Sequence, residues 1–220
     1  MNRTEMGFKE KLFLLSIDQE NGRLKSQNNF YLVILYASVW ELMRKKLIVI
    51  HEKNWQISQK PTNDPVLDEV QSILAKSDGK KPQWQTLNIS TKSQKLFKLQ
   101  VEWMVRNKWI EASRTSFLGI PTGYRFRILK PEILRKDLTA LERVLIYGRK
   151  PSPEAWMMIQ FLGIPRILRS FFRSSESKQR VNTRFSELNK TPPFEVPTEF
   201  VLIIKKFKEA IESSKTASAD

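Results

Sequence analysis

The sequence contains no cysteine, a single histidine, and no apolar run that approaches the roughly 20 residues of a membrane span. Without cysteine there is no disulfide framework and no thiolate nucleophile. No run of residues has zinc-ligand spacing, and no glycine-rich segment matches a P-loop or a dinucleotide-binding turn. The histidine, His51, stands beside Glu52 in a predicted strand–turn region, where a lone histidine is typical of a structural or exposed role. We therefore expect neither an enzyme nor a bound cofactor.

Positive charge, in contrast, is abundant. The chain has 38 Lys and Arg against 23 Asp and Glu, a formal net charge of +15. Residues 90–150 hold 14 of the cations against 5 acidic residues, and residues 163–184 hold 6 against 1. Such an excess favours polyanionic partners, either nucleic acid or a membrane surface with acidic lipids, although an inert basic surface would have the same composition.

The N-terminal segment has an apolar patch, but charges interrupt it and no small-residue cleavage site follows. This pattern argues against a secretory signal peptide. We therefore expect a cytoplasmic protein that is either soluble or peripheral on the cytosolic face of a membrane.

Hydrophobic periodicity predicts a mainly α-helical chain. Helices are expected over residues 5–16, 30–46, 65–76, 92–109, 131–147, 153–162, 164–173, 179–188 and 197–211, with short strands over 47–50 and 55–57 and a short element of undecided type over 84–89. Asn28 or Asn29 is the expected N-cap of the second helix, and Asp64 followed by Pro65 opens the third. In the helix over 164–173, three arginines would share one face: Arg166, Arg169 and Arg173. We predict one helical domain over 5–212, with a prominent β-hairpin, and a disordered tail over 213–220.

The segment from Lys92 to Leu129 is the most distinctive part of the chain. Its helical half spaces apolar residues so that one face is buried: Leu96, Leu99, Val101, Trp103 and Met104. Its second half has β-branched and aromatic residues on both sides of a predicted turn that contains Gly119, Pro121 and Gly123. The turn is unusually apolar, because it also carries Phe117, Leu118 and Ile120.

This apolar tip has two interpretations. The three side chains either pack on a neighbouring helix or insert into a bilayer, where full burial of each contributes about 1.5–3 kcal/mol. Basic residues near an anionic bilayer add on the order of 1 kcal/mol each, so the tip and the charges together would give reversible attachment.

Two other functions fit the same pattern. A helix followed by a basic hairpin is also the order of a winged-helix nucleic-acid-binding domain, in which the hairpin would be the wing. Its phosphate contacts would be Lys95, Lys98, Arg125 and Arg127. Against this function, the helix is heavily apolar and lacks an exposed row of residues for base edges. The third hypothesis is a protein-interaction adaptor that accepts acidic segments and binds no lipid.

Five segments, in order, resemble the Golgi phosphoprotein-three family. They are FKEKLFLLSIDQENGRL from residue 8, WELMRKKLIVI from residue 40, DPVLDEVQSIL from residue 64, VEWMVRNKWIEA from residue 101 and ILRSFF from residue 167. The order and spacing hold from about residue 8 to residue 211. The resemblance is that of a divergent or prokaryotic member.

The resemblance implies a largely helical domain that binds membranes containing phosphatidylinositol 4-phosphate and dips a hydrophobic hairpin into the bilayer. It also implies a Golgi location in a eukaryote, binding of cytosolic tails of membrane proteins, and self-association into a homo-oligomer. The inserting role falls on Phe117, Leu118 and Ile120. The family's headgroup tryptophan and arginines align here with Gln27, Leu35 or Tyr36, Gln94 and Phe97. We therefore take basic residues nearby as candidates for binding phosphatidylinositol 4-phosphate or another acidic lipid: Lys25, Lys95, Lys98, Arg125 and Arg127.

Overall fold

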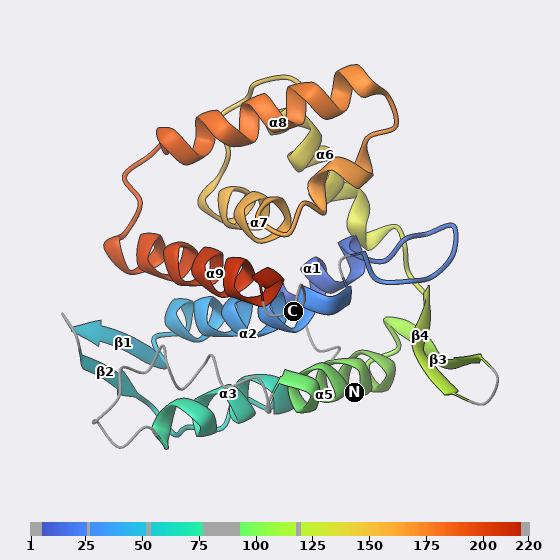
Figure 1. Ribbon diagram of the computed structural model, residues 1–220. Helices are drawn as coiled ribbons and strands as arrows, with labels where there is room; N and C mark the ends of the chain where they lie inside the picture. Colours follow the sequence, from blue (N-terminus) through green and yellow to red (C-terminus); the bar gives the residue numbers. More distant parts are fainter. Residues whose placement is uncertain (1–5, 26, 52–53, 77–92, 118–119, 217–220) are drawn as a thin grey trace.

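The computed structural model describes residues 6–25, 27–51, 54–76, 93–117 and 120–216. Within them the chain forms eight α-helices and two separate two-stranded antiparallel hairpins (Figure 1). The predicted mainly α-helical fold with a β-hairpin is thus confirmed. The predicted short element over 84–89, Leu118, Gly119 and residues 217–220 lie outside the described residues.

The elements follow one another as α1 (Phe8–Leu15), α2 (Gln27–Arg44), β1 (Ile48–His51), β2 (Asn54–Ile57), α3 (Pro65–Ala75), α5 (Ser93–Arg106), β3 (Ile110–Phe117), β4 (Ile120–Ile128), α6 (Ile133–Leu145), α7 (Pro153–Gly163), the 3-10 helix η2 (Leu168–Phe171), α8 (Ser175–Lys190) and α9 (Thr198–Thr216). None of these described helices is both long enough and apolar enough to cross a bilayer.

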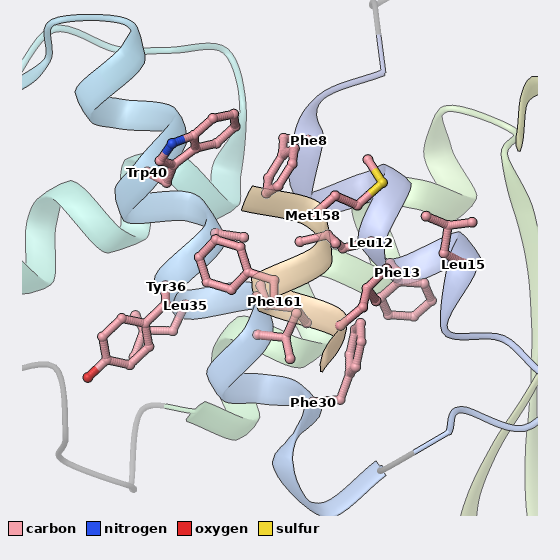
Figure 2. Packing of buried hydrophobic residues seen from close by; sticks show 14 of the residues in the cluster. Phe8, Leu12, Phe13, Leu15, Phe30, Leu35, Tyr36, Trp40, Met158 and Phe161 are labelled. Carbon is pink, nitrogen blue, oxygen red and sulfur yellow. The ribbon is translucent and has the colours of Figure 1, made fainter. Parts of the chain in front are cut away.

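Helix α2 lies at the centre of the fold and packs against α1, α3, α5, α7 and α9. Its sequence is apolar nearly all round, and such a helix is stable only when other elements cover every side. Aromatic rings fill the space around it: the Trp40 ring lies 4.2 Å from that of Phe8, and Phe8 in turn meets Phe161 at 5.9 Å (Figure 2). This packing buries the apolar surface of α2, as its sequence requires.

Local capping chemistry sets several helix ends. The Asp64 carboxylate accepts hydrogen bonds from the backbone N–H groups of Val66 and Leu67 at 2.9 and 3.2 Å, which confirms the predicted cap of α3. The predicted cap of α2 is wrong, because this helix already begins at Gln27 and both asparagines lie in its first turn.

The predicted helix over 164–173 is also wrong. Helix α7 ends at Gly163, and the chain continues through a turn into the single 3-10 turn η2. Pro165 has no N–H to extend a helix, and Arg166 adopts a left-handed φ of 66°. Arg166, Arg169 and Arg173 therefore do not share one helical face. At the other end of the chain, α9 continues to Thr216 rather than ending at residue 211, because no proline or glycine interrupts it.

Candidate functional site

The hairpin β3–β4 projects from the helical body on the side opposite to β1–β2 (Figure 1). Its register runs from Ile110 paired with Ile128 at the root to Phe117 paired with Ile120 at the far end. Pro121 and Gly123, expected in the turn, belong to β4 instead, and the register shifts by one residue opposite them, between Thr115 and Ser116. Such a bulge increases the twist of a hairpin where it leaves its support.

The root of the hairpin is fixed by an aromatic cluster. The buried Phe126 ring of β4 meets the Phe13 ring of α1 edge-on at 5.2 Å, and Phe13 meets Phe30 of α2 at 5.4 Å (Figure 2). Tyr124 stacks on Phe126 at 5.8 Å and contacts Phe97 of α5 at 6.0 Å. Because rings of α1 and α5 contact β4 directly, and Phe30 of α2 supports Phe13, the core fixes the orientation of the hairpin.

The loop that precedes Lys25 lies against the same strand. Its Gly22 carbonyl accepts a hydrogen bond from the Phe126 N–H at 2.7 Å. Gly22 has a φ of 71°, and a Cβ at this position would lie 2.7 Å from the Phe126 carbonyl oxygen. Both the backbone conformation and the lack of space therefore require glycine here. As a result, the loop carrying Lys25 and the strand carrying Arg125 and Arg127 lie together.

Ion pairs divide the five predicted headgroup residues into two groups. Three already contact a carboxylate: Lys95 with Glu69 at 2.7 Å, Lys98 with Glu102 at 3.8 Å, and Arg127 with Glu111 at 2.9 Å. In the part of the chain that the structure describes, no carboxylate lies within ion-pair distance of Lys25 or Arg125. These two are thus the cations of the set that are most available to an anionic ligand.

Lys25 has an unusual environment for a surface lysine. Its side chain is half-buried, and its Nζ lies 5.2 Å from the ring centroid of Phe171 in η2. Burial lowers the pKa of Lys25, and the negative charges of Asp18 and Glu20 only partly offset this effect. A desolvated ammonium without a direct carboxylate contact is stabilised by any anion that binds beside it.

The positions that align with the family's headgroup pocket have other roles in this fold. Leu35 and Tyr36 are buried in the core beside Phe161 and Phe207, and Phe97 belongs to the aromatic cluster at the hairpin root. None of these three side chains is placed to contact a headgroup at the surface. Of the predicted inserting residues, Phe117 and Ile120 form the last described pair of the hairpin, and Leu118 lies outside the described residues.

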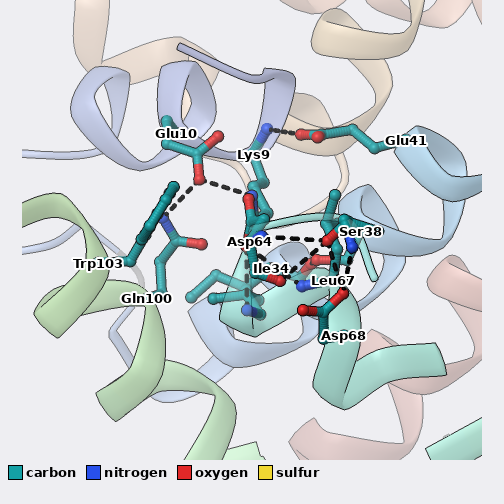
Figure 3. Close-up of polar contacts among 12 residues, drawn as sticks. Lys9, Glu10, Ile34, Ser38, Glu41, Asp64, Leu67, Asp68, Gln100 and Trp103 are labelled. Atoms are coloured by element: carbon teal, nitrogen blue, oxygen red, sulfur yellow. Dashed lines mark hydrogen bonds and ion pairs between the residues drawn. The ribbon is translucent and has the colours of Figure 1, made fainter. Parts of the chain in front are cut away.

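A buried ionic cluster around Lys9 was not predicted from the sequence (Figure 3). The Nζ of Lys9 contacts a carboxylate oxygen of Glu10 at 2.6 Å and also bonds Asp64. The Lys9 backbone N–H donates to Glu41 at 2.6 Å, and the Gln100 amide donates to Glu10 at 3.1 Å. The cluster joins α1, α2, α5 and the cap of α3. In the sequence, the adjacent Lys9 and Glu10 look like an ordinary charged interruption of an apolar helix, so no local signal indicates that they are buried.

The electrostatics of this cluster are those of one cation shared by three carboxylates. Burial disfavours the charge of Lys9, but the surrounding Glu10, Glu41 and Asp64 outweigh this effect and raise its pKa. Burial also raises the pKa of Glu41 to about 7, although Lys9 opposes that shift. The side chains of Lys9 and Glu10 are 0% and 1% exposed, so water cannot replace either partner of the pair.

Among the described residues, no group of three or more His, Cys, Asp or Glu side chains is arranged so that it could hold a metal ion. His51 pairs with Asn54 at the end of β1–β2, remote from the hairpin β3–β4 (Figure 1).

The family model described as Golgi phosphoprotein 3 matches residues 8–202. All five segments quoted for the resemblance start and end within that span. No curated protein matches the sequence.

Proposed function

The chain belongs to the Golgi phosphoprotein 3 family, and on this basis we propose that it is a peripheral membrane protein. It binds anionic phospholipid headgroups, of which phosphatidylinositol 4-phosphate is one, through the basic residues around the hairpin root and inserts the tip of β3–β4 into the bilayer.

The geometry of the hairpin carries this proposal. An aromatic root holds β3–β4, and the strands project beyond the helices (Figure 1), with Phe117 and Ile120 as the last described pair. Arg114, Arg125 and Arg127 are exposed along the strands. A hairpin with an apolar end and a cationic shaft matches the polarity gradient from acyl chains to acidic headgroups.

Within this mechanism Lys25 and Arg125 have the leading role at the headgroup, because both lack a carboxylate partner in the described part of the chain. A phosphate beside Lys25 would restore the favourable electrostatics that burial removes from its ammonium group. Lys95, Lys98 and Arg127 supply longer-range attraction, which their own ion pairs weaken.

The protein acts without catalysis in this proposal. It resides on the cytosolic face of a membrane, that of the Golgi in a eukaryote, and its further partners are cytosolic tails of membrane proteins and other copies of the same chain.

Sedimentation with liposomes tests the membrane function. The liposomes contain phosphatidylcholine alone or with phosphatidylserine, phosphatidic acid or phosphatidylinositol 4-phosphate. We expect binding only with acidic lipid, and we expect Phe117→Asp/Leu118→Asp to lower the partition coefficient by more than about a hundredfold, since two buried side chains contribute about 3–6 kcal/mol. The matched control is Val49→Asp, at a 38% exposed position on the other hairpin, which should bind as the wild type does.

Two results would contradict the proposed membrane function. One is binding that does not depend on acidic lipid, and the other is unchanged binding of the tip variant. Salt-sensitive binding to duplex DNA that displaces liposomes would favour a winged-helix function instead. Partners that survive high salt and detergent in a pull-down, without any liposome binding, would favour an adaptor.

A further inference from the structure

A cavity lies on the part of the molecule formed by α7, α8 and α9. Its volume is about 790 Å³, which is within the range of about 300–1,000 Å³ that ligand pockets occupy. The walls come from these three helices, from η2 and from the turn between α7 and η2; in Figure 1, α7 lies between α8 and α9. None of the residues of the hairpin or of its aromatic root contributes to it.

One wall of the cavity contains an amide that lacks partners. Gln160 of α7 is wholly buried, and neither its side-chain nitrogen nor its oxygen has a hydrogen-bond partner in the described structure. Buried side-chain amides are nearly always satisfied in folded proteins, because dehydrating them without a partner is costly. Gln160 thus leaves a donor and an acceptor unsatisfied at the wall of the cavity.

The rim of the cavity is cationic. Arg166, Arg169, Lys205 and Lys208 line it against one carboxylate, Glu212. Lys208 lies 4.0 Å from Glu212, whereas the other three cations have no carboxylate within ion-pair distance among the described residues. Mutual repulsion of these charges is relieved when an anion binds between them.

The end of α7 places Arg166 at the cavity, in the left-handed position that Lys46 and Lys108 take after α2 and α5. Helix α7 ends with hydrogen bonds from the Arg166 N–H to the Gly163 carbonyl at 2.9 Å and from the Ile167 N–H to the Leu162 carbonyl at 2.8 Å. The residue that turns the chain in such an ending is usually glycine, because it takes a left-handed conformation. Here it is Arg166, with φ at 66°, so an arginine side chain occupies a position where it strains the backbone.

Apolar side chains, among them Leu168, Val181, Phe185 and Ile204, form most of the remaining walls, which also contain Asn182 and Asn189. We propose that this cavity binds an anionic single-chain amphiphile, such as a lysophosphatidate or a fatty acid. The acidic head lies between Arg166, Arg169 and Lys205, and the chain lies along the apolar walls. The excess of cations over carboxylates favours this ligand over a zwitterionic lipid. The inference does not depend on the membrane function of the hairpin.

Calorimetric titration of the full chain tests the site, with oleoyl lysophosphatidate below its critical micelle concentration as the probe. We expect saturable one-to-one binding. Oleate distinguishes a carboxylate head from a phosphate head, and binding of either supports the site. Oleoyl lysophosphatidylcholine has the same chain without net charge, and glycerol 3-phosphate has the head without the chain, so we expect both to bind much more weakly.

Variants separate binding from folding. Arg166→Gly/Arg169→Gln should lower the affinity about a hundredfold, since each charge-assisted contact is worth about tenfold or more. Glycine suits the left-handed position, so this variant should remain folded. Gln160→Leu should unfold no more easily than the wild type, yet bind more weakly. The matched control is Arg173→Gln, an exposed arginine of the same segment outside the cavity, which should leave the affinity unchanged.

The hairpin variant Phe117→Asp/Leu118→Asp should bind lysophosphatidate normally. Loss of membrane binding by the hairpin can therefore be distinguished from loss of lysophosphatidate binding in the cavity. Lys25 variants do not serve this purpose, because Lys25 lies against Phe171 in the same 3-10 turn as Arg169. The inference is overturned if the wild type binds none of the anionic probes, if lysophosphatidylcholine binds equally well, or if the double arginine variant retains full affinity. Binding of an acidic amphipathic peptide in the absence of lysophosphatidate binding would also overturn it.

Discussion

Replacing Lys9 by methionine tests how the buried ionic cluster holds α1, α2, α5 and the start of α3 together. The Lys9 side chain is 0% exposed, its Nζ contacts Glu10 at 2.6 Å and also bonds Asp64, and its backbone N–H binds Glu41. Methionine keeps a similar length and an apolar stem. It removes the cation and leaves three carboxylates facing one another in the interior.

The expected loss follows from this geometry. Removing one partner of a buried ion pair costs about 3–5 kcal/mol, because the remaining charge is left without compensation. Since three carboxylates share Lys9, we expect a value near the upper end, about 4–5 kcal/mol, at pH 8. At pH 5 the loss should be smaller, because Glu41, with a pKa raised to about 7, is then protonated and one negative charge fewer remains.

Urea unfolding, followed by tryptophan fluorescence and circular dichroism at both pH values, gives the free energies of unfolding. The matched control is Lys11→Met on the same helix. Lys11 is 25% exposed and pairs with the partly exposed Glu154 at 2.9 Å, so its replacement should cost only about 0–1 kcal/mol. Adding Glu41→Gln to Lys9→Met should recover part of the stability at pH 8. A loss for Lys9→Met no larger than that for Lys11→Met at pH 8 would refute the reasoning.

Three further predictions concern single residues. The raised pKa of Glu41 means that the folded state favours its protonated form, so its contribution to stability is complete below about pH 4.5 and is lost as the pH rises through about 7. Glu41→Gln should therefore flatten the fall of the melting temperature over this pH range. An unchanged slope would contradict this prediction. In urea unfolding, Gly22→Ala should cost more stability than Gly148→Ala. Both positions have a left-handed backbone, which costs alanine about 1–2 kcal/mol, but only at Gly22 would the new Cβ also clash with a carbonyl oxygen. Equal losses for the two variants would be inconsistent with this clash. In liposome sedimentation Arg125→Ala should weaken binding more than Arg127→Ala, because Arg127 is already paired, and the reverse order would argue against Arg125 as a headgroup contact.

The sequence predictions that the structure confirms rest on signals within a few neighbouring residues. The central position of α2 follows from an apolar surface on all its sides, and the start of α3 follows from Asp64 and Pro65 alone. The hairpin β3–β4 follows from alternating β-branched and aromatic residues. These features depend on neighbours within a few residues, so they can be read without knowing the fold.

The prediction failed where a local signal was ambiguous. Pro165 can open a helix or follow the end of one, and in this chain it follows the end of α7. Pro121 and Gly123 are turn residues by type, but the pairing of β3 with β4 includes both in a strand. Only the positions of the partner strand and of the preceding helix decide between such alternatives.

The sequence by itself therefore determined the mainly helical class, the family, the excess of positive charge and the apolar hairpin tip. The tertiary structure alone decided which of those charges are available. Lys95 is paired with a carboxylate 26 residues away and Arg127 with one 16 residues away, whereas Lys25 and Arg125 have no carboxylate partner in the described part of the chain. It also decided that Lys9 is buried and that α7, α8 and α9 enclose a cationic cavity. The physical reason is that burial and charge pairing depend on which distant segments meet in space, and no short stretch of sequence contains that information.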